Sequence, residues 1–341
     1  MGLGIIHFSY NTVFFMHQQP QKTLTTTLHR FVHFSSLSNS SRPPIWTKSP
    51  PLSSSFTFMA TQLNLSQLGS SPSSLSIQKY DLLIVGPGVL GRLVANQWRQ
   101  EYQGCQVFGQ TLTTDHHEEL IQLGISPSLN WTKSEHKFPY VIVCAPPYQS
   151  SDYHGDLRQA AESWNGEGSF LYTSSSAPYD CNDNGLCDED TPVVPIGRSP
   201  RTDVLLKAEN IVLEFGGSVV RLSGLYKEGK GAHAYYLEKG IVESRPDHVL
   251  NLIHYEDAAS LSVAILKKQF RGKIFLGCDN HPLSRQELMD LVDKSGKFSK
   301  KFKKFTGTND PLGKRLNNSR TREEVGWEPK YTSFAHFLET L

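Results

Sequence analysis

A glycine-rich turn between an apolar run and a helical pattern carries the strongest chemical signal in this sequence. Residues 80–85 read YDLLIV, a run of strand length, and GPGVLG follows at 86–91. In a strand–turn–helix unit, Gly86 permits the tight turn, Gly88 lets the backbone approach a pyrophosphate, and Gly91 lets the helix pack on the strand. The helix is indicated by apolar residues at helical spacing: Leu90, Leu93, Val94 and Trp98. The pattern predicts a dinucleotide-binding turn.

The first turn of that helix would meet the phosphates through its backbone. Amides at a helix N-terminus point at an anion, and the helix dipole favours negative charge there. We therefore expect Val89 and Leu90 to contact the cofactor together with the three glycines. Incidental glycines in an ordinary strand-to-helix turn are the alternative interpretation.

The end of the second predicted strand bears on the choice between NAD and NADP. NAD-binding turns usually have an acid about 20 residues beyond the glycines, where it holds the ribose 2′-hydroxyl. Here that place reads Gly109-Gln110-Thr111, and the first acid is Asp115. Without a carboxylate to repel a 2′-phosphate, and with the Thr111 hydroxyl as a donor, the sequence favours NADP. No arginine stands there as positive evidence, so NAD stays open.

Strand and helix patterns alternate along the chain, which favours a mostly parallel sheet covered on both faces. We expect further strands at 105–108, 140–144, 169–173 and 218–222. We expect helices at 116–124, 203–215 and 257–268, a helix opened by a capping box at 284–287, and a short amphipathic helix at the end. The fold class is therefore α/β, a Rossmann-type doubly wound parallel sheet with a small C-terminal α/β substrate lobe.

The carboxyl ends of the strands should hold the ligand, because right-handed crossovers bring these ends to one edge of the sheet. Ala145 and Pro146 follow the buried run at 140–144 and should contact the cofactor next to Gly86. Thr173 marks the end of the neighbouring strand.

Six segments resemble the atypical branch of the extended short-chain dehydrogenase/reductases, which is related to the sugar-nucleotide epimerases. They are GPGVLG (86–91), VIVCAPP (141–147), YTSSSAPY (172–179), RLSGLY (221–226), NLIHYEDAA (251–259) and RLNNSRTREEVGWEPKY (315–331). The resemblance covers residues 80–341. It implies an NAD(P)-binding domain in which residues 222–255 and 270–341 contribute the substrate lobe.

The resemblance also implies a catalytic Ser, Tyr and Lys, of which the serine alone has a match. Ser175 lies four residues before Tyr179, where the epimerase-like pattern places it. The usual Tyr-x-x-x-Lys slots fall on Arg201 and Leu205, and an arginine cannot take the proton because it is always charged. Tyr179 is the remaining candidate phenol, with a packed aromatic as its alternative role.

Two later tyrosines have a lysine at the same spacing outside the expected helix: Tyr226 with Lys230, and Tyr235 with Lys239. Their chain context differs from that of a catalytic pair. Tyr226 instead resembles the family's substrate-side loop, so we expect it to contact the substrate. Arg198 or Arg201 would hold an anionic group of that substrate.

An NAD(P)-binding oxidoreductase or epimerase-like enzyme acting on a small molecule is the first interpretation. A catalytically inactive dinucleotide-binding scaffold or regulator is the second, because the Tyr–Lys pair is missing. Lysines interleaved with phenylalanines at 294–305 raise RNA association as a third, although the pattern favours a solvated loop with buried phenyl anchors. The net charge of +1 shows no bias toward nucleic acid, and the histidines have no metal-binding spacing.

Residues 1–79 differ from the rest in composition. All 33 acidic residues lie at or after Asp81, whereas the preceding stretch is basic and rich in Ser and Thr. Such a leader is typical of an organelle transit peptide, and with the resemblance it indicates a plant plastid, the chloroplast. A disordered tail is one alternative, and translation from Met59, which would leave the protein in the cytoplasm, is another. No apolar run reaches the roughly 18 residues of a membrane span.

The five cysteines lack metal-ligand spacing, which indicates a reduced compartment without a disulfide framework. Cys181 and Cys187 flank an acidic loop, DCNDNGLCDED at 180–190. In a plastid they could form a light-regulated disulfide, although nearby carboxylates should raise the thiol pKa and slow exchange. Two unconnected structural cysteines are the alternative.

Overall fold

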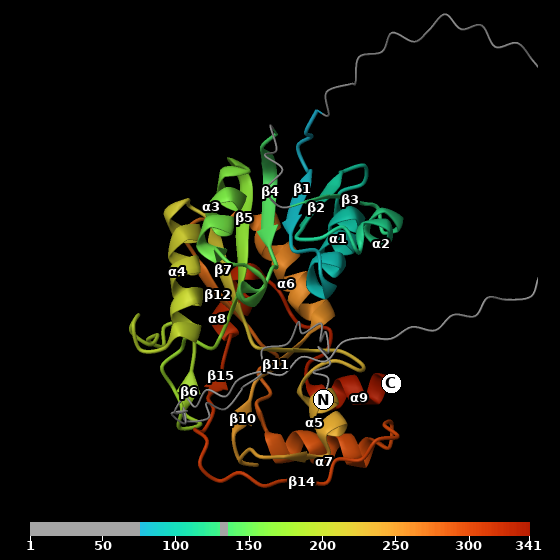
Figure 1. Ribbon diagram of the computed structural model, residues 1–341, viewed down its shortest axis with the longest axis vertical. Coiled ribbons are helices and arrows are strands. Elements are labelled where there is room, and N and C mark those ends of the chain that lie inside the picture. The colour runs from blue at the N-terminus through green and yellow to red at the C-terminus, as the bar shows by residue number, and fades with distance from the viewer. Residues whose placement is uncertain (1–75, 130–135) are drawn as a thin grey trace, which may run out of the picture. The chain divides into compact units, whose positions relative to one another are not determined.

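A seven-stranded parallel sheet lies at the centre of the described chain (Figure 1). The computed structural model describes residues 76–129 and 136–341. The strand order is β12-β7-β5-β4-β1-β2-β3, with every neighbouring pair parallel. These strands are β1 (Leu82–Val85), β2 (Val107–Thr111), β3 (Ile125–Leu129), β4 (Phe138–Val143), β5 (Trp164–Ser175), β7 (Ser218–Leu222) and β12 (Ile274–Gly277). The order reverses between β1 and β4, so the crevice at their carboxyl ends is the topological switch point.

Both faces of the sheet are covered, which confirms the predicted doubly wound α/β fold. Helices α1 (Val89–Glu101) and α6 (Tyr255–Lys268) pack on one face, and α3 (Tyr153–Glu162) and α4 (Pro200–Glu214) on the other. Alternate side chains of β1 enter the two layers, Leu82 and Ile84 toward α1, Leu83 and Val85 toward α3. A strand buried on both faces needs an unbroken apolar run, which is why this segment reads LLIV.

Most of the elements predicted around the sheet are present, with shifted bounds. The sequence predicts the second strand at 105–108, whereas β2 occupies 107–111. Just ahead of β2, Gln106 N donates a hydrogen bond to Oδ1 of the buried Asp81 at 2.8 Å. The edge strand β3, which reads ISPSL and lacks an apolar run, was not predicted, and neither were the short β12 and the helix α3. The helix α2 (His117–Gln122) is one residue shorter at its start and two shorter at its end than predicted.

The lobe predicted to hold the substrate, called the substrate lobe below, lies beyond the carboxyl ends of the sheet strands, in the lower half of Figure 1. An aromatic cluster joins its helices α5 (Ala232–Lys239), α7 (Arg285–Ser295) and α9 (Phe334–Thr340). Its short strands are β8 (Gly224–Tyr226), β9 (Ile241–Val242), β10 (Val249–Leu250), β11 (Leu252–His254), β13 (Leu283–Ser284) and β14 (Lys304–Phe305). The remaining elements are η1 (Pro147–Gln149), β6 (Leu186–Cys187), β15 (Arg315–Leu316) and α8 (Ser319–Val325).

The capping box predicted at the start of α7 is confirmed. Ser284 Oγ accepts from Glu287 N at 3.1 Å, and the Glu287 carboxylate accepts from Ser284 N at 2.7 Å. These two bonds satisfy helix-end amides that would otherwise lack partners.

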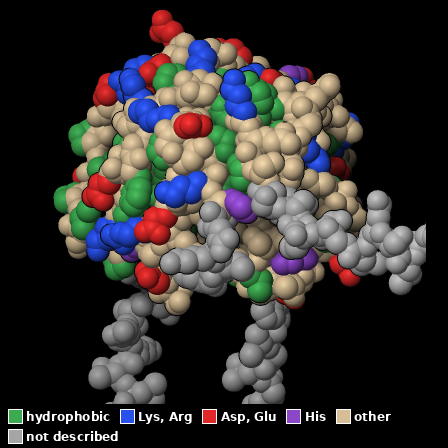
Figure 2. All heavy atoms as spheres, turned by 90° about the horizontal axis from the view of Figure 1, so that it is seen from above, with side chains coloured by type: hydrophobic (Ala, Val, Ile, Leu, Met, Phe, Trp, Pro, Cys, Tyr) green, Lys and Arg blue, Asp and Glu red, His purple; other side chains and the backbone are tan. Residues whose placement is uncertain are grey.

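The predicted leader lies almost wholly outside the described residues, so its removal and its address stay predictions. Across 76–129 and 136–341, no helix has the length and apolar character to cross a bilayer. In the same ranges, no three His, Cys, Asp or Glu side chains converge as metal ligands would. On the face drawn in Figure 2, basic and acidic side chains are interspersed.

Candidate functional site

Gly86 is held where only a glycine fits. Its φ is +79°, a left-handed value that side chains rarely adopt, and a Cβ there would lie 2.7 Å from the backbone of Ala145. Gly86 N donates to Gln110 O at 2.9 Å, and Gly88 N donates back to Gly86 O at 2.7 Å. The turn therefore folds tightly over the end of β1 and against the end of β4.

The other two glycines of the turn have different requirements. A Cβ at Gly91 would lie 2.9 Å from Ile84 Cγ2 and 3.2 Å from Gly86 O, so Gly91 permits the close packing of α1 on β1. Gly88, by contrast, has φ −76°, which any residue can adopt. Its backbone conformation therefore does not require a glycine, and access to the turn remains as the reason for one.

The N-terminus of α1 has no side-chain cap among the described residues. Gly88 is the N-cap, and the first turn contains no acid. Leu90 is buried and Val89 packs on the same core, so neither side chain is available to cap the helix, and backbone amides are what its first turn can offer a ligand. With the helix dipole, these amides suit a phosphate.

The end of β4 completes this crevice. Cys144 N and Ala145 N both donate to Val85 O, at 2.8 and 3.1 Å. Tyr153 Oη donates to Ala145 O at 2.8 Å and fixes the segment from the α3 side. Ala145, followed by Pro146, thus lies against Gly86 at the switch point, and the structure brings these predicted cofactor residues together.

The end of β2 differs from the expectation for Thr111. Its hydroxyl lies within hydrogen-bond distance of three groups of the protein: Thr113 O at 2.9 Å, Ser128 O at 3.2 Å and His117 Nε2 at 2.7 Å. A hydroxyl has one proton to donate. The Thr111 proton is therefore directed at the protein itself, and this geometry gives no support to a bond with a 2′-phosphate.

Arg92 is a charged residue between the glycine turn and α2 that was not predicted from the sequence. Its Nε donates to Pro87 O at 3.1 Å, which holds the side chain on the glycine turn. Its guanidinium pairs with Glu119 of α2, the helix that follows β2. A Cβ on Gly109 of β2 would lie 3.1 Å from Pro87 Cγ, so the turn and β2 are in contact. An arginine directly after the third glycine was the available signal.

Ser175 lies at the carboxyl end of β5, beside β4 in the sheet. Its Oγ accepts a hydrogen bond from Ala177 N at 3.2 Å, which leaves the hydroxyl proton available. In the same strand, Thr173 Oγ1 donates to Val143 O at 3.0 Å and ties β5 to β4. The predicted catalytic serine and the predicted cofactor turn thus lie at the same edge of the sheet.

Tyr179 is enclosed by protein. It is 2% exposed, and its ring lies 4.8 Å from the guanidinium carbon of Arg221. Burial raises the pKa of Tyr179 to about 12, and the Arg221 cation offsets this only in part. A phenol with that pKa keeps its proton through the neutral range. Its position is that of a packed aromatic and gives no support to an acid–base role.

A buried ion pair that the sequence analysis missed supports this packing. Arg221 of β7 pairs with Glu209 of α4, with Nη2 and Oε2 2.7 Å apart and both side chains buried. Ser174 Oγ donates to the same carboxylate at 2.6 Å. The network joins α4 to β5 and β7, and a buried charge needs such partners. None of the sequence motifs considered above assigns a role to Glu209, so its pairing with Arg221 was not predicted.

Comparison with known proteins identifies the architecture. No family model matches the chain. Over 165 residues, or 47% of this chain, the sequence is 27% identical to Protein YeeZ of Escherichia coli K12, and the match covers 58% of that protein's length.

Solved structures match much more of the chain. A functionally unknown conserved protein from Silicibacter pomeroyi is 23% identical with a TM-score of 0.62, covering 76% of this chain and 97% of that one. The dTDP-glucose 4,6-dehydratase of Bacillus anthracis, solved in complex with NAD, is 14% identical with a TM-score of 0.64, covering 76% and 94%. The chain shares the Rossmann fold of this dehydratase.

In this fold, the two positions that the resemblance assigns to a catalytic Tyr–Lys pair, Arg201 and Leu205, fall on α4. Arg201 is the second residue of that helix and exposed, whereas Leu205 is 8% exposed and packs inward. Arg198, predicted to hold an anionic substrate, has its Nη1 2.8 Å from both carboxylate oxygens of Asp180. Asp180 therefore already neutralises the charge of Arg198, although its Nε and Nη2 donors make no bond to Asp180.

Tyr226 lies inside the substrate lobe rather than at a surface. It is 0% exposed, and its ring packs 5.1 to 5.2 Å from the rings of His254, Phe334 and Phe337. Burial, and then the charges of Asp279 and Asp257, raise the pKa of Tyr226 well above its ordinary value. This position gives no support to the prediction that Tyr226 contacts substrate.

Proposed function

We propose that this protein binds a nicotinamide dinucleotide at the Gly86–Gly91 turn and acts as an oxidoreductase or epimerase-like enzyme on a small molecule. The observation that carries the proposal is the close approach of Gly86 to Ala145 at the switch point, beside an uncapped α1 N-terminus. Fixed amides and a gap without side chains are what a pyrophosphate requires. The fold, shared with an NAD-bound dehydratase, supports the same reading.

NADP is the cofactor that we favour. The end of β2 carries no carboxylate, since Gln110 and Thr111 stand where an acid would hold the ribose hydroxyls. Arg92 supplies a cation on the turn, next to α2. Its partner Glu119 would be exchanged for a 2′-phosphate, which carries more charge than a carboxylate.

The reaction would use Ser175. When bound, the nicotinamide ring supplies or accepts a hydride. The Ser175 hydroxyl, at the end of the strand beside Ala145, would donate a hydrogen bond to the reacting oxygen of the substrate and stabilise the charge that develops there. A sugar nucleotide is the first substrate class to test, because the NAD-bound dehydratase of the same fold is named for one.

A dinucleotide-binding protein without hydride transfer is the second candidate function. It is favoured by Leu205 in the lysine slot and by the buried, weakly acidic Tyr179, since neither can replace the missing acid–base pair. In that case the cofactor would bind and never turn over.

Calorimetry with NADPH and NADH on the purified protein tests the shared part of both candidates. We expect binding of at least one in the micromolar range, and no binding of either at millimolar concentration would end both. A panel of carbonyl compounds and sugar nucleotides, read by NAD(P)H absorbance, then separates them. Turnover of any member supports the enzyme, and cofactor binding without turnover supports the scaffold.

We also propose that the protein is imported into the chloroplast. The proposal rests on the acid-free, Ser- and Thr-rich composition of residues 1–79. Residues 1–80 fused to a fluorescent protein should enter plastids in plant cells, whereas the chain started at Met59 should stay in the cytosol. A diffuse cytosolic signal from both would mean that the leader carries no address.

A further inference from the structure

Three of the five cysteines gather around Tyr179. Cys187 and Cys278 belong to one buried cluster with Tyr179 and Leu316, and the half-buried Cys181 packs against it. All five cysteines are free thiols in this structure. Neither the cofactor turn nor the proposed reaction uses any of these three sulfur atoms.

The chain folds back on itself between Cys181 and Cys187. Asn184, midway between them, has φ +61°, a left-handed value typical of a tight turn. Cys181 Sγ donates to Asp183 Oδ1 at 3.3 Å and lies 3.6 Å from Gly185 O, directly ahead of the strand β6 that ends at Cys187. The turn therefore directs one thiol toward the segment that carries the other.

This loop is attached to the substrate lobe and to the segment before β15. Asn184 Oδ1 accepts from Gly313 N at 2.7 Å and from Val249 N at 3.1 Å, and Asn184 N donates to Gly313 O at 2.8 Å. Next along the chain, Lys314 Nζ donates to Tyr179 O at 2.6 Å and to Ser176 O at 3.3 Å. One lysine thus connects the loop, the end of β5 and the C-terminal segment.

The same ammonium acts on both sulfur atoms. Burial raises the pKa of both thiols, and Asp183 adds to this for Cys181, whereas Lys314 lowers both pKa values. Asp180 raises the pKa of Lys314, and Asp188 raises the pKa of Cys187. Cys181 is the accessible thiol, and Cys187, 2% exposed, lies behind it. An accessible attacking thiol with a second thiol behind it is the arrangement of a redox pair.

We propose that Cys181 and Cys187 form a reversible disulfide, and that a protein disulfide of the thioredoxin class is the oxidant. The Cys181 thiolate attacks one sulfur of the oxidant, a mixed disulfide forms, and the first oxidant thiolate leaves. The Cys187 thiolate then attacks Cys181 Sγ, and the second oxidant thiolate leaves. The two cysteines lose two electrons and two protons, and the oxidant becomes a dithiol.

The disulfide would close the loop that separates Ser175 from the lobe. A covalent ring from 181 to 187 restricts the Asn184 turn, and through it the segment in which Lys314 holds the carbonyls after Ser175. An effect on turnover rests on the proposed function, whereas the disulfide itself does not. A failure of one can therefore be told from a failure of the other.

Mass mapping of the full chain tests the bond directly. Reduced protein is treated with oxidised thioredoxin, the remaining thiols are alkylated, and peptides are read before and after dithiothreitol. We expect the peptide that contains 181 and 187 to lose 2 Da from its reduced mass and to regain both thiols on reduction. Amide hydrogen exchange over 180–190 should slow in the oxidised form because the ring restricts local opening.

Matched variants fix the assignment. Cys181→Ser and Cys187→Ser should each abolish the intramolecular bond, and Cys105→Ser, outside the cluster, should leave it unchanged. Lys314→Met should slow oxidation roughly fivefold at pH 7, because a cation that favours the thiolate is removed, and Lys314→Arg should restore the rate. A bond from Cys187 to Cys278, or oxidation of Cys181 alone to an acid, would overturn the proposal. Because the mapping uses the wild-type chain, it decides the question even if a variant fails to fold.

Discussion

Two neighbouring parts of the sheet edge differ in how much of their machinery is present. At β1 and β4, the left-handed Gly86, its close approach to Ala145 and the uncapped α1 all fit the anion binding that we propose. At β5, Ser175 is in place, but the residues expected to act with it are replaced or buried. The difference indicates that cofactor binding and catalysis depend on separate structural requirements within one fold. A chain can therefore keep the first and change the second.

The largest effect that would sharpen this comparison comes from Gly88→Val. Because the φ of Gly88 is −76°, a value that residues with side chains also adopt, we expect valine to leave the turn folded and to place its branched side chain where the pyrophosphate would approach. We expect cofactor affinity to fall on the order of 100-fold, measured by calorimetry, while the melting temperature stays within a few degrees. Cofactor affinity like that of the wild type in a folded Gly88→Val protein would show that the turn is merely structural.

Gly86→Ala is the matched control at the same turn. A Cβ there meets the backbone of Ala145 at 2.7 Å, in a backbone conformation that alanine rarely adopts. It should therefore lower the free energy of unfolding by roughly 2–4 kcal/mol, read by urea denaturation. Equal stability losses in the two variants would mean that the two glycines do not have distinct roles.

The second largest effect concerns the β5 side of the comparison. If a substrate is turned over, Ser175→Ala should lower kcat about 100-fold and leave the dissociation constant of the cofactor unchanged. Tyr179→Phe is the matched control, because burial raises the pKa of Tyr179 to about 12 and its ring packs on Arg221. It should change kcat by less than about twofold. A large loss in Tyr179→Phe would restore that phenol as an acid–base group.

Arg92→Ala tests the cofactor choice and has a smaller expected effect. Removing the cation should weaken NADPH binding about tenfold and NADH binding less than twofold. Glu119→Gln should act in the opposite direction on NADPH, because it frees Arg92 from its ion pair. Arg99→Ala, near the far end of α1, is the control on the same helix. Equal losses for both cofactors would assign Arg92 to the fold of the turn.

The sequence predicted the β1 and β4 side well, because its requirements are local. Gly86, Gly91 and the apolar run before them act over a few residues of one strand–turn–helix unit. A pattern of glycines and apolar residues therefore suffices to place the turn, the sheet and the serine strand. The resemblance placed Ser175 for the same reason, since it lies at the end of such a strand.

The environments of the other predicted site residues depend on contacts between distant segments. The ring of Tyr179 packs against Arg221, which lies 42 positions later, and Arg198 forms an ion pair with Asp180 across a loop. Tyr226 resembles a substrate-loop residue by its neighbours, yet α9, at the far end of the chain, buries it. Spacing along the chain carries no information about these partners, so the sequence could not predict which side chains stay accessible.

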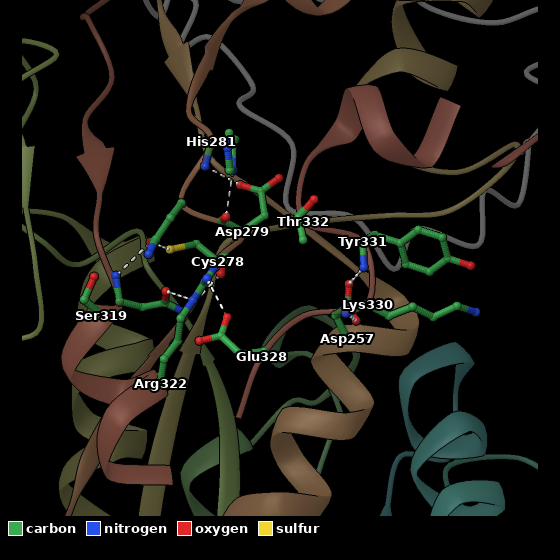
Figure 3. A network of polar contacts seen from close by, with 12 residues as sticks. Asp257, Cys278, Asp279, His281, Ser319, Arg322, Glu328, Lys330, Tyr331 and Thr332 are labelled. Atoms are coloured by element: carbon green, nitrogen blue, oxygen red, sulfur yellow. Dashed lines mark hydrogen bonds and ion pairs between the residues drawn. The ribbon is translucent and has the colours of Figure 1, made fainter. Parts of the chain in front are cut away.

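The smallest effect concerns the pH dependence of stability, which we expect to arise outside both the glycine turn and the end of β5. Figure 3 shows the buried carboxylates Asp257 and Asp279 where the lobe joins α6. Burial raises the pKa of Asp257 to about 6 and that of Asp279 to about 7, from an ordinary value of 3.8. Between the ordinary pKa of 3.8 and these raised pKa values, the folded chain therefore binds more protons than the unfolded chain. Stability from these groups is full below about pH 4 and falls as pH rises through 7.

Asp279→Asn should remove the larger part of this dependence. Asp279 Oδ1 accepts from His281 N at 2.9 Å, whereas Oδ2 has no partner among the described residues, so an amide keeps the bond that exists. The melting temperature of the variant relative to the wild type should therefore rise by a few degrees between pH 5 and pH 8.

Asp257→Asn is the contrast, because both its oxygens accept hydrogen bonds from backbone amides, those of Lys330 and Tyr331, and one bond would be lost at every pH. Calorimetric melts at several pH values measure both, and cofactor affinity at pH 7 should stay unchanged in Asp279→Asn. A difference in melting temperature that does not vary with pH would mean that Asp279 stays ionised in the folded protein, and a parallel loss of cofactor affinity would couple this junction to the glycine turn.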